Sequence, residues 1–293
     1  MRLYRKAKMV ALIPAKMLQG FTSIKPRSSR SVIFPHQGLG DLIWTLGITK
    51  YHKSKYKEVV LIANEIWHRE LTNLLDRYTW GKEIRIFPVK VNFKTGDHTV
   101  LPTMRELFSD SDFYPLGWFG DSYPVFYPDW FYLDARTPRS FMTSLNTSEI
   151  GGEFDAICRR YDLPLRQFAY SYIHLQSGTQ DVDPATFERK FLNGVDALTI
   201  CPHHIFSSPS TKDTRIATHF HEVAKSLLLW ENLVLSYYAS DTAIVDSALF
   251  NLMAATKLWP RNLTVLKRSD YHHFWGRILR GPFKEVPSRS LRK

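Results

Sequence analysis

Short apolar runs alternate with helix-like stretches in the first half of the chain. The runs at residues 31–35, 59–64 and 84–89 have the length and composition of buried strands. Between them, residues 41–53 and 67–78 carry apolar side chains at helical spacing. Strands that alternate with helices in this way are typical of a parallel sheet with crossover helices. The pattern therefore predicts an α/β first half.

The second half repeats the alternation, so the sequence predicts two Rossmann-like α/β units. The expected elements are a helix at 153–161, a strand in the second half of 162–175, a short helix at 185–192, a strand at 197–204, a helix at 216–230, a strand at 233–241, a helix at 241–257 and a strand at 263–268.

An aromatic segment at residues 110–134 interrupts this alternation. It holds ten aromatic residues with three prolines and two glycines, which fits neither a helix nor a regular strand. Such a segment can stack on the apolar faces of sugar rings, or it can pack a long connection onto the domain surface. We favour packing.

The net charge of +11 is concentrated at the two ends of the chain. Residues 1–30 hold eight Lys or Arg and no acid, and residues 267–293 hold eight against two acids, which leaves −3 for the middle. An acidic middle argues against a continuous groove for nucleic acid. We therefore expect a basic leader at 1–30 and a basic tail, for which solvation is favoured and contact with a membrane surface is the alternative.

Composition indicates a soluble protein of a reducing compartment. The chain has 293 residues, 44% of them hydrophobic, and no unbroken apolar run approaches the roughly 20 residues that span a bilayer. Cys158 and Cys201 lack partners at metal-ligand spacing and are typical of buried thiols. A cytoplasmic location follows, membrane-peripheral if the basic tails bind lipid.

The most informative motif is Gly-Leu-Gly-Asp, where the first strand ends and a helix begins. Gly38 and Gly40 would permit positive φ or close approach of a ligand to the backbone. A dinucleotide site would fit Glu65, but its third glycine position holds Ile43. Asp41 would repel a phosphate yet could accept a proton from a ligand hydroxyl. The alternative is that Asp41 only caps the helix.

These residues resemble a family. GLGDLIWTLG, from Gly38, is similar to the Gly-Asp motif of heptosyltransferase-like glycosyltransferases of the GT-B fold, which implies that Asp41 is the general base. Residues 240–256 resemble the family's Asp-Thr-Gly-x-x-His helix start, with Ala243 and Asp246 at the glycine and histidine positions. The resemblance implies two domains facing each other across a cleft. It also implies donor-binding residues Ser210, Thr211, Lys212, Ser240, Asp241 and Thr242.

The sequence thus predicts an enzyme that transfers a sugar from a nucleotide-sugar donor to a hydroxyl of a glycan or related acceptor. Residues 31–180 would bind the acceptor, with Gly38 and Gly40 as backbone contacts, and residues 195–293 would bind the donor. Direct displacement would invert the anomeric centre, with no metal and no cofactor. The partners would then be the donor and the acceptor rather than nucleic acid.

Two other interpretations remain open. Asp110 and Asp112 have the Asp-x-Asp spacing with which a metal-dependent glycosyltransferase holds a cation on the donor diphosphate. Neither His203 with His204 nor His219 with His221 has the geometry of a zinc site. The second interpretation is a non-catalytic protein that binds nucleotides or nucleic acid.

Overall fold

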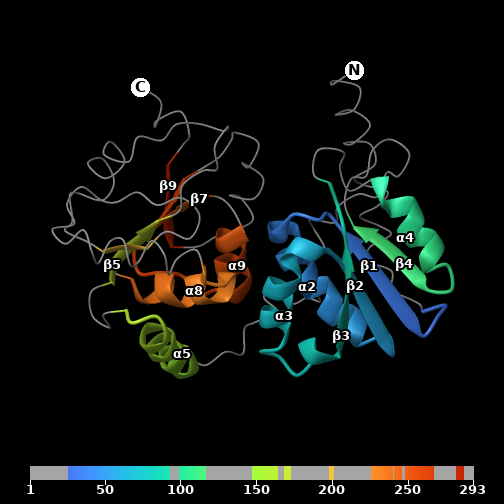
Figure 1. The fold of residues 1–293 in the computed structure, drawn as a ribbon, viewed down its shortest axis with the longest axis horizontal. Helices are drawn as coiled ribbons and strands as arrows, with labels where there is room; N and C mark the ends of the chain where they lie inside the picture. Colours follow the sequence, from blue (N-terminus) through green and yellow to red (C-terminus); the bar gives the residue numbers. More distant parts are fainter. Residues whose placement is uncertain are drawn as a thin grey trace, which may run out of the picture. The chain divides into compact units, whose positions relative to one another are not determined.

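The computed structural model divides the chain into two compact units, Met1–Phe141 (unit 1) and Met142–Lys293 (unit 2). The described residues are 26–92, 99–116, 147–163, 168–172, 198–200, 226–239, 241–245, 248–266 and 282–286. Each unit contains a sheet whose strands all pair in parallel, with helices packed against it (Figure 1). The α/β class predicted from the sequence is confirmed.

Unit 1 has a sheet of order β3-β2-β1-β4. The strands predicted at 31–35, 59–64 and 84–89 and the helix predicted at 41–53 are confirmed, and the helix predicted at 67–78 is shorter. The elements are β1 (Arg30–Pro35), α2 (Leu39–Lys53), β2 (Glu58–Asn64), η1 (Glu65–Trp67), α3 (His68–Leu75), η2 (Gly81–Glu83), β3 (Ile84–Val89), α4 (Leu101–Leu107) and β4 (Asp112–Leu116).

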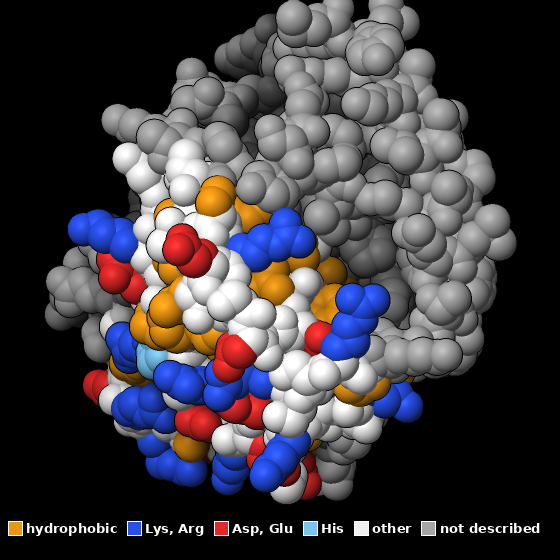
Figure 2. All heavy atoms as spheres, turned by 90° about the vertical axis from the view of Figure 1, so that its right-hand side faces the viewer, with side chains coloured by type: hydrophobic (Ala, Val, Ile, Leu, Met, Phe, Trp, Pro, Cys, Tyr) orange, Lys and Arg blue, Asp and Glu red, His pale blue; other side chains and the backbone are white. Residues whose placement is uncertain are grey.

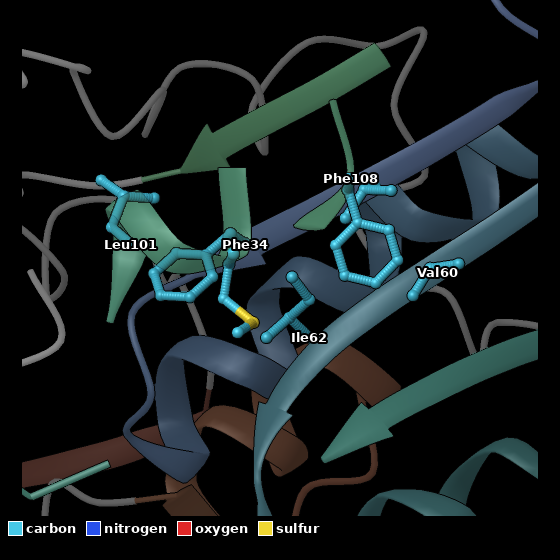
Figure 3. Packing of buried hydrophobic residues seen from close by; sticks show 7 residues of the cluster. Phe34, Val60, Ile62, Leu101 and Phe108 are labelled. Atoms are coloured by element: carbon cyan, nitrogen blue, oxygen red, sulfur yellow. The ribbon is translucent and has the colours of Figure 1, made fainter. Parts of the chain in front are cut away.

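Helices cover both faces of this sheet. Helices α2 and α3 lie on one face and α4 lies on the other (Figure 1). Alternate residues of β1 and β2, such as Phe34 and Ile62, point toward α4 and pack against Leu101 and Phe108 (Figure 3). Each of the largest buried side chains stabilises the fold by about 2 kcal/mol. Because both faces are buried, β1 and β2 read as continuous apolar runs rather than alternating ones.

Strand β4 corrects the prediction for the start of the aromatic segment. Asp112–Leu116 was expected to be irregular, yet it pairs with β1 from Ser31 to Pro35. Pro115 is tolerated because β4 lies at the edge of the four-stranded sheet, where a missing N–H costs no ladder bond on the open side. The remainder of the segment, and with it the sugar-stacking interpretation, lies outside the described residues.

Unit 2 has a sheet of order β6-β5-β7-β8-β9. Its β5 strand pairs with β6 and β7, so α5 and β5 belong to unit 2, and the boundary predicted near residue 180 is wrong. Part of the basic tail forms β9 and extends this sheet. The elements are α5 (Thr147–Arg160), β5 (Phe168–Tyr172), β6 (Leu198–Ile200), α8 (Leu229–Tyr238), β7 (Asp241–Val245), α9 (Ala248–Thr256), β8 (Leu263–Leu266) and β9 (Phe283–Val286).

Two predictions in unit 2 exchange helix and strand. The strand predicted at 233–241 is mostly α8, and the helix predicted at 241–257 begins as β7. Helix α8 is buried from Leu229 to Ser236, so its sequence shows no amphipathic period. The Glu231 carboxylate accepts a hydrogen bond from Leu228 N at 2.9 Å and pairs with Arg160 at 2.6 Å. These contacts fix the start of the helix.

A buried polar network lies at the amino ends of the unit 1 strands. Ser31 Oγ and His52 Nδ1 share a hydrogen bond of 2.7 Å. His52 is 2% exposed, and its burial, partly opposed by Asp112, lowers its pKa from 6.5 to about 4. The imidazole is therefore neutral at neutral pH.

Asp112 fastens the start of β4 to the segment that precedes β1. Its Oδ2 accepts hydrogen bonds from Arg27 N at 2.7 Å, Ser28 N at 3.3 Å and Tyr56 Oη at 2.9 Å. Burial opposes ionisation, but these hydrogen bonds outweigh it and hold the pKa of Asp112 below its usual value. The last residues of the predicted leader are thus anchored to the sheet.

The neutral His52 makes the stability of unit 1 depend on pH. Since its folded pKa is depressed, the unfolded chain binds more protons between pH 6.5 and about 4. Its contribution of about 3 kcal/mol is complete above pH 6.5 and is lost as the pH falls to about 4. We expect the free energy of unfolding from urea titrations to fall over this pH range. Hydrogen exchange of the backbone amides of β1 and α2 should show the same fall for unit 1.

The variant His52→Asn removes the titrating group, and we expect the fall in this window to disappear. His68→Asn, which removes an exposed imidazole from the same unit, is the matched control and should retain the fall. An unchanged pH dependence in His52→Asn would contradict the assignment.

Candidate functional site

The connection from β1 to α2 lies where the strand order of unit 1 reverses. From β1 the chain continues to β2 and then β3 on one side, and it later returns to β4 on the other side of β1. Open parallel sheets bind ligands outside the carboxyl ends of their strands at such a reversal. The Gly-Leu-Gly-Asp turn follows the carboxyl end of β1. The topology thus makes this turn the candidate site of unit 1.

Gly38 is required here for close approach and not for its backbone angles. It is the N-cap of α2 with φ −70° and ψ 140°, which other residues also adopt, so of the two uses considered for this glycine, positive φ does not apply. A Cβ on Gly38 would lie 2.9 Å from Oδ2 of Asp41. The glycine therefore makes room for a carboxylate beside the main chain. Gly40 lies in the first turn of α2.

Asp41 is the third residue of α2 and is half-buried. A negative charge in the first turn of a helix interacts favourably with the partial positive charge of the helix N-terminus. The Asp41 carbonyl accepts a hydrogen bond from Thr45 Oγ1 at 2.8 Å within the helix. The geometry therefore agrees with a stabilising role at the helix start, and it also presents a carboxylate at the carboxyl edge of the sheet.

The turn is held by residues that the sequence reasoning missed. The buried amide of Gln37 donates to Pro35 O at 2.7 Å and to Ile62 O at 3.4 Å. Trp67 Nε1 donates to Gln37 O at 3.0 Å. These bonds tie the end of β1 to the end of β2. The sequence feature that could have indicated this role is a glutamine that closely follows a buried apolar run. At such a position a side-chain amide can donate hydrogen bonds to backbone carbonyls.

The dinucleotide alternative finds no support in this connection. Ile43 is fully buried in α2, so a branched side chain fills the position where a dinucleotide-binding motif has its third glycine. Glu65 does follow β2, where a ribose-binding acid would be expected, and it is exposed. One acidic residue without the glycine pattern is not sufficient for a dinucleotide-binding site.

The structure describes two of the six residues that the sequence predicts to bind the donor, Asp241 and Thr242. Asp241 and Thr242 begin strand β7 and do not start a helix, because the helix α9 begins only at Ala248. Thr242 is buried, and its hydroxyl donates to Ser236 O at 3.0 Å. The expected helix start at 240–242 is therefore wrong. Ser240, Ser210, Thr211 and Lys212 lie outside the described residues.

The topology of unit 2 indicates a candidate ligand site at the carboxyl end of β7, opposite the end that holds Asp241 and Thr242. Its strand order reverses between β5 and β7, since the chain runs from β5 to β6 on one side and then to β7 on the other. The carboxyl ends at this reversal are Tyr172 and Val245. Asp241 and Thr242 lie at the amino end of β7, away from the edge at which such sheets bind ligands.

The carboxylates of Asp110 and Asp112 are engaged by other groups. Asp110 pairs with Arg30 at 3.5 Å, and Asp112 accepts backbone hydrogen bonds at the amino edge of the sheet. This arrangement opposes the alternative in which the pair holds a donor-bound cation. Among the described residues, no group of three or more His, Cys, Asp or Glu is placed to hold a metal ion.

No known family model, curated protein or solved structure matches the chain. Within the described part of the chain, none of the helices has the length and apolar character required to cross a bilayer.

Two glycines of unit 1 offer a matched test of this geometry. A Cβ on Gly38 would meet the end of a movable side chain, so we expect Gly38→Ala to cost about 1 kcal/mol or less while displacing the Asp41 carboxylate. A Cβ on Gly81 would lie 2.2 Å from the Leu75 carbonyl oxygen, so Gly81→Ala should cost at least about 2 kcal/mol. Urea denaturation of both variants measures the difference. Equal destabilisation by the two substitutions would contradict it.

Proposed function

We propose that the chain is a glycosyltransferase that moves a sugar from a nucleotide-sugar donor to a hydroxyl of a glycan or related acceptor. The observation that supports this best is the carboxylate of Asp41 beside the Cβ-free backbone of Gly38, at the strand reversal of unit 1. A phosphate-binding turn would avoid an acid at this position, whereas a hydroxyl acceptor benefits from one.

In the proposed reaction Asp41 accepts the proton of the acceptor hydroxyl. The hydroxyl oxygen forms a bond to the anomeric carbon of the donor sugar, and the bond from that carbon to the diphosphate oxygen breaks. The nucleoside diphosphate leaves with the electron pair. One displacement inverts the anomeric centre and requires no covalent intermediate.

Unit 2 would bind the donor at the carboxyl ends of β5 and β7. This edge replaces the expected site at residues 240–242, because the latter lies at the amino end of β7. Lys212 is retained as a candidate for the charge on the leaving diphosphate, on its sequence position after the predicted strand at 197–204. Catalysis requires the two carboxyl edges to face one substrate pair across a cleft.

A ligand panel tests the proposal against a protein that does not bind nucleotides. We expect one nucleotide sugar, and the nucleoside diphosphate derived from it, to raise the thermal midpoint of unfolding. At a concentration 100 times the dissociation constant the stabilisation is about 3 kcal/mol. Chelation of divalent cations should leave the shift unchanged, since the proposed mechanism uses no metal.

The corresponding nucleoside and the free sugar are the controls and should give small shifts. A panel of nucleotide sugars that gives no shift would contradict the proposal. Binding of a nucleotide sugar without release of nucleoside diphosphate in the presence of acceptor glycans would instead favour a non-catalytic binder.

A further inference from the structure

The two edges of the unit 1 sheet differ in charge. The amino edge comprises the segments that precede the strands, residues 26–30, 50–58, 76–85 and 105–112. These segments hold ten Lys or Arg against six acids, a net charge of +4. At the carboxyl edge, residues 36–41, 64–70 and 88–92 hold two against three, a net charge of −1. Cations therefore gather at the edge opposite the Asp41 turn.

Several acids of the amino edge already have cationic partners. Glu58 pairs with Arg30 at 2.7 Å, and Glu83 pairs with Lys53 at 2.8 Å. Asp110 also contacts Arg30, and Asp112 binds backbone N–H groups. The positive charge left over belongs to side chains that point to solvent. Figure 2 shows many Lys and Arg side chains, with Asp and Glu among them, over the lower part of the face that it presents.

Three exposed lysines contribute to this excess. Lys55 and Lys57 lie in the connection from α2 to β2, and Lys82 lies in η2, directly before β3. None of the three forms an ion pair within the described ranges. Lys55 Nζ lies 5.8 Å from the centre of the Tyr51 ring, a contact that leaves its charge available.

The basic leader joins the folded unit at this same edge. Asp112 holds the backbone of Arg27 and Ser28, immediately before β1. Residues 1–26 contain six Lys or Arg and no acid, interspersed with aliphatic residues such as Leu12, Ile13 and Leu18. Leu107, at the end of α4 that meets the amino edge, is 56% exposed. Among the described residues, Leu107 thus adds an exposed aliphatic group on the side of these lysines, while Ile66 at the carboxyl edge is equally exposed, so charge is what distinguishes the two edges.

We propose that the amino edge of the unit 1 sheet binds an anionic membrane surface. Lysine ammonium groups would neutralise phosphodiester headgroups, while the exposed Leu107 side chain would enter the boundary between headgroups and acyl chains. The aliphatic composition of the leader sequence also favours a bilayer over nucleic acid, whose backbone offers such side chains no apolar phase. The strands span about 20 Å, so bound unit 1 holds the Asp41 edge away from the lipid.

The test compares two pairs of charge reversals in the full chain. Lys55→Glu with Lys57→Glu changes the amino edge, and Arg69→Glu with Lys90→Glu makes the same change in net charge at the carboxyl edge. Binding is measured by sedimentation with vesicles of phosphatidylcholine alone and of equal parts phosphatidylcholine and phosphatidylglycerol. We expect the natural chain to bind the anionic vesicles only, with an affinity that falls as salt is added.

The amino-edge pair should lower the partition coefficient at least about 30-fold, because the loss of two basic residues accounts for that factor and the two added glutamates are repelled by the anionic surface. The carboxyl-edge pair should change it little, and circular dichroism verifies that both variants fold. Absence of binding, equal binding to neutral vesicles or equal loss in both pairs would overturn the proposal. Tighter binding to a DNA duplex than to anionic vesicles at equal salt would also overturn it.

Discussion

The position of β1 between β2 and β4 is the constraint on which the rest of unit 1 depends. Parallel pairing on both sides makes β1 a central strand, buried on both faces, and forces the chain to reverse beside it. The reversal leaves the β1–α2 turn at the carboxyl edge, where this kind of sheet binds ligands. It also gathers the segments before the strands at the opposite edge, which gives the unit its two chemically different ends.

At the carboxyl edge the Asp41 carboxylate stabilises the start of α2, and the proposed mechanism gives it a second role. The absence of a side chain on Gly38 lets Asp41 fold back toward the helix start, where its charge is stabilised by the helix N-terminus. A general base must likewise be a carboxylate, and not a carboxylic acid, to accept the proton. Stability and the proposed chemistry are therefore compatible at this residue, so helix capping does not argue against the proposed catalytic role.

The sequence predicted unit 1 better than unit 2 for a physical reason. In unit 1 the apolar runs are separated by glycines and charged residues, so the length of each run distinguishes strand from helix. In unit 2 helix α8 is buried on most sides, and its apolar run has the appearance of a strand. That error shifted the following elements and placed Asp241 and Thr242 at a helix start. Periodicity does not reveal contacts between residues that are distant in the sequence. For this reason it missed the hydrogen bond from Gln37 to Ile62 O, the ion pair of Asp110 with Arg30 and the hydrogen bond that Asp112 accepts from Arg27 N.

The central claim is that the Asp41 carboxylate removes the acceptor proton. The most direct measurement is the turnover number for acceptor-dependent release of nucleoside diphosphate by Asp41→Asn, compared with Asp76→Asn at an exposed position after α3. The account predicts a loss of about 10²-fold or more in Asp41→Asn with donor affinity retained, and no loss in Asp76→Asn. Near-normal turnover in a folded Asp41→Asn variant would contradict it.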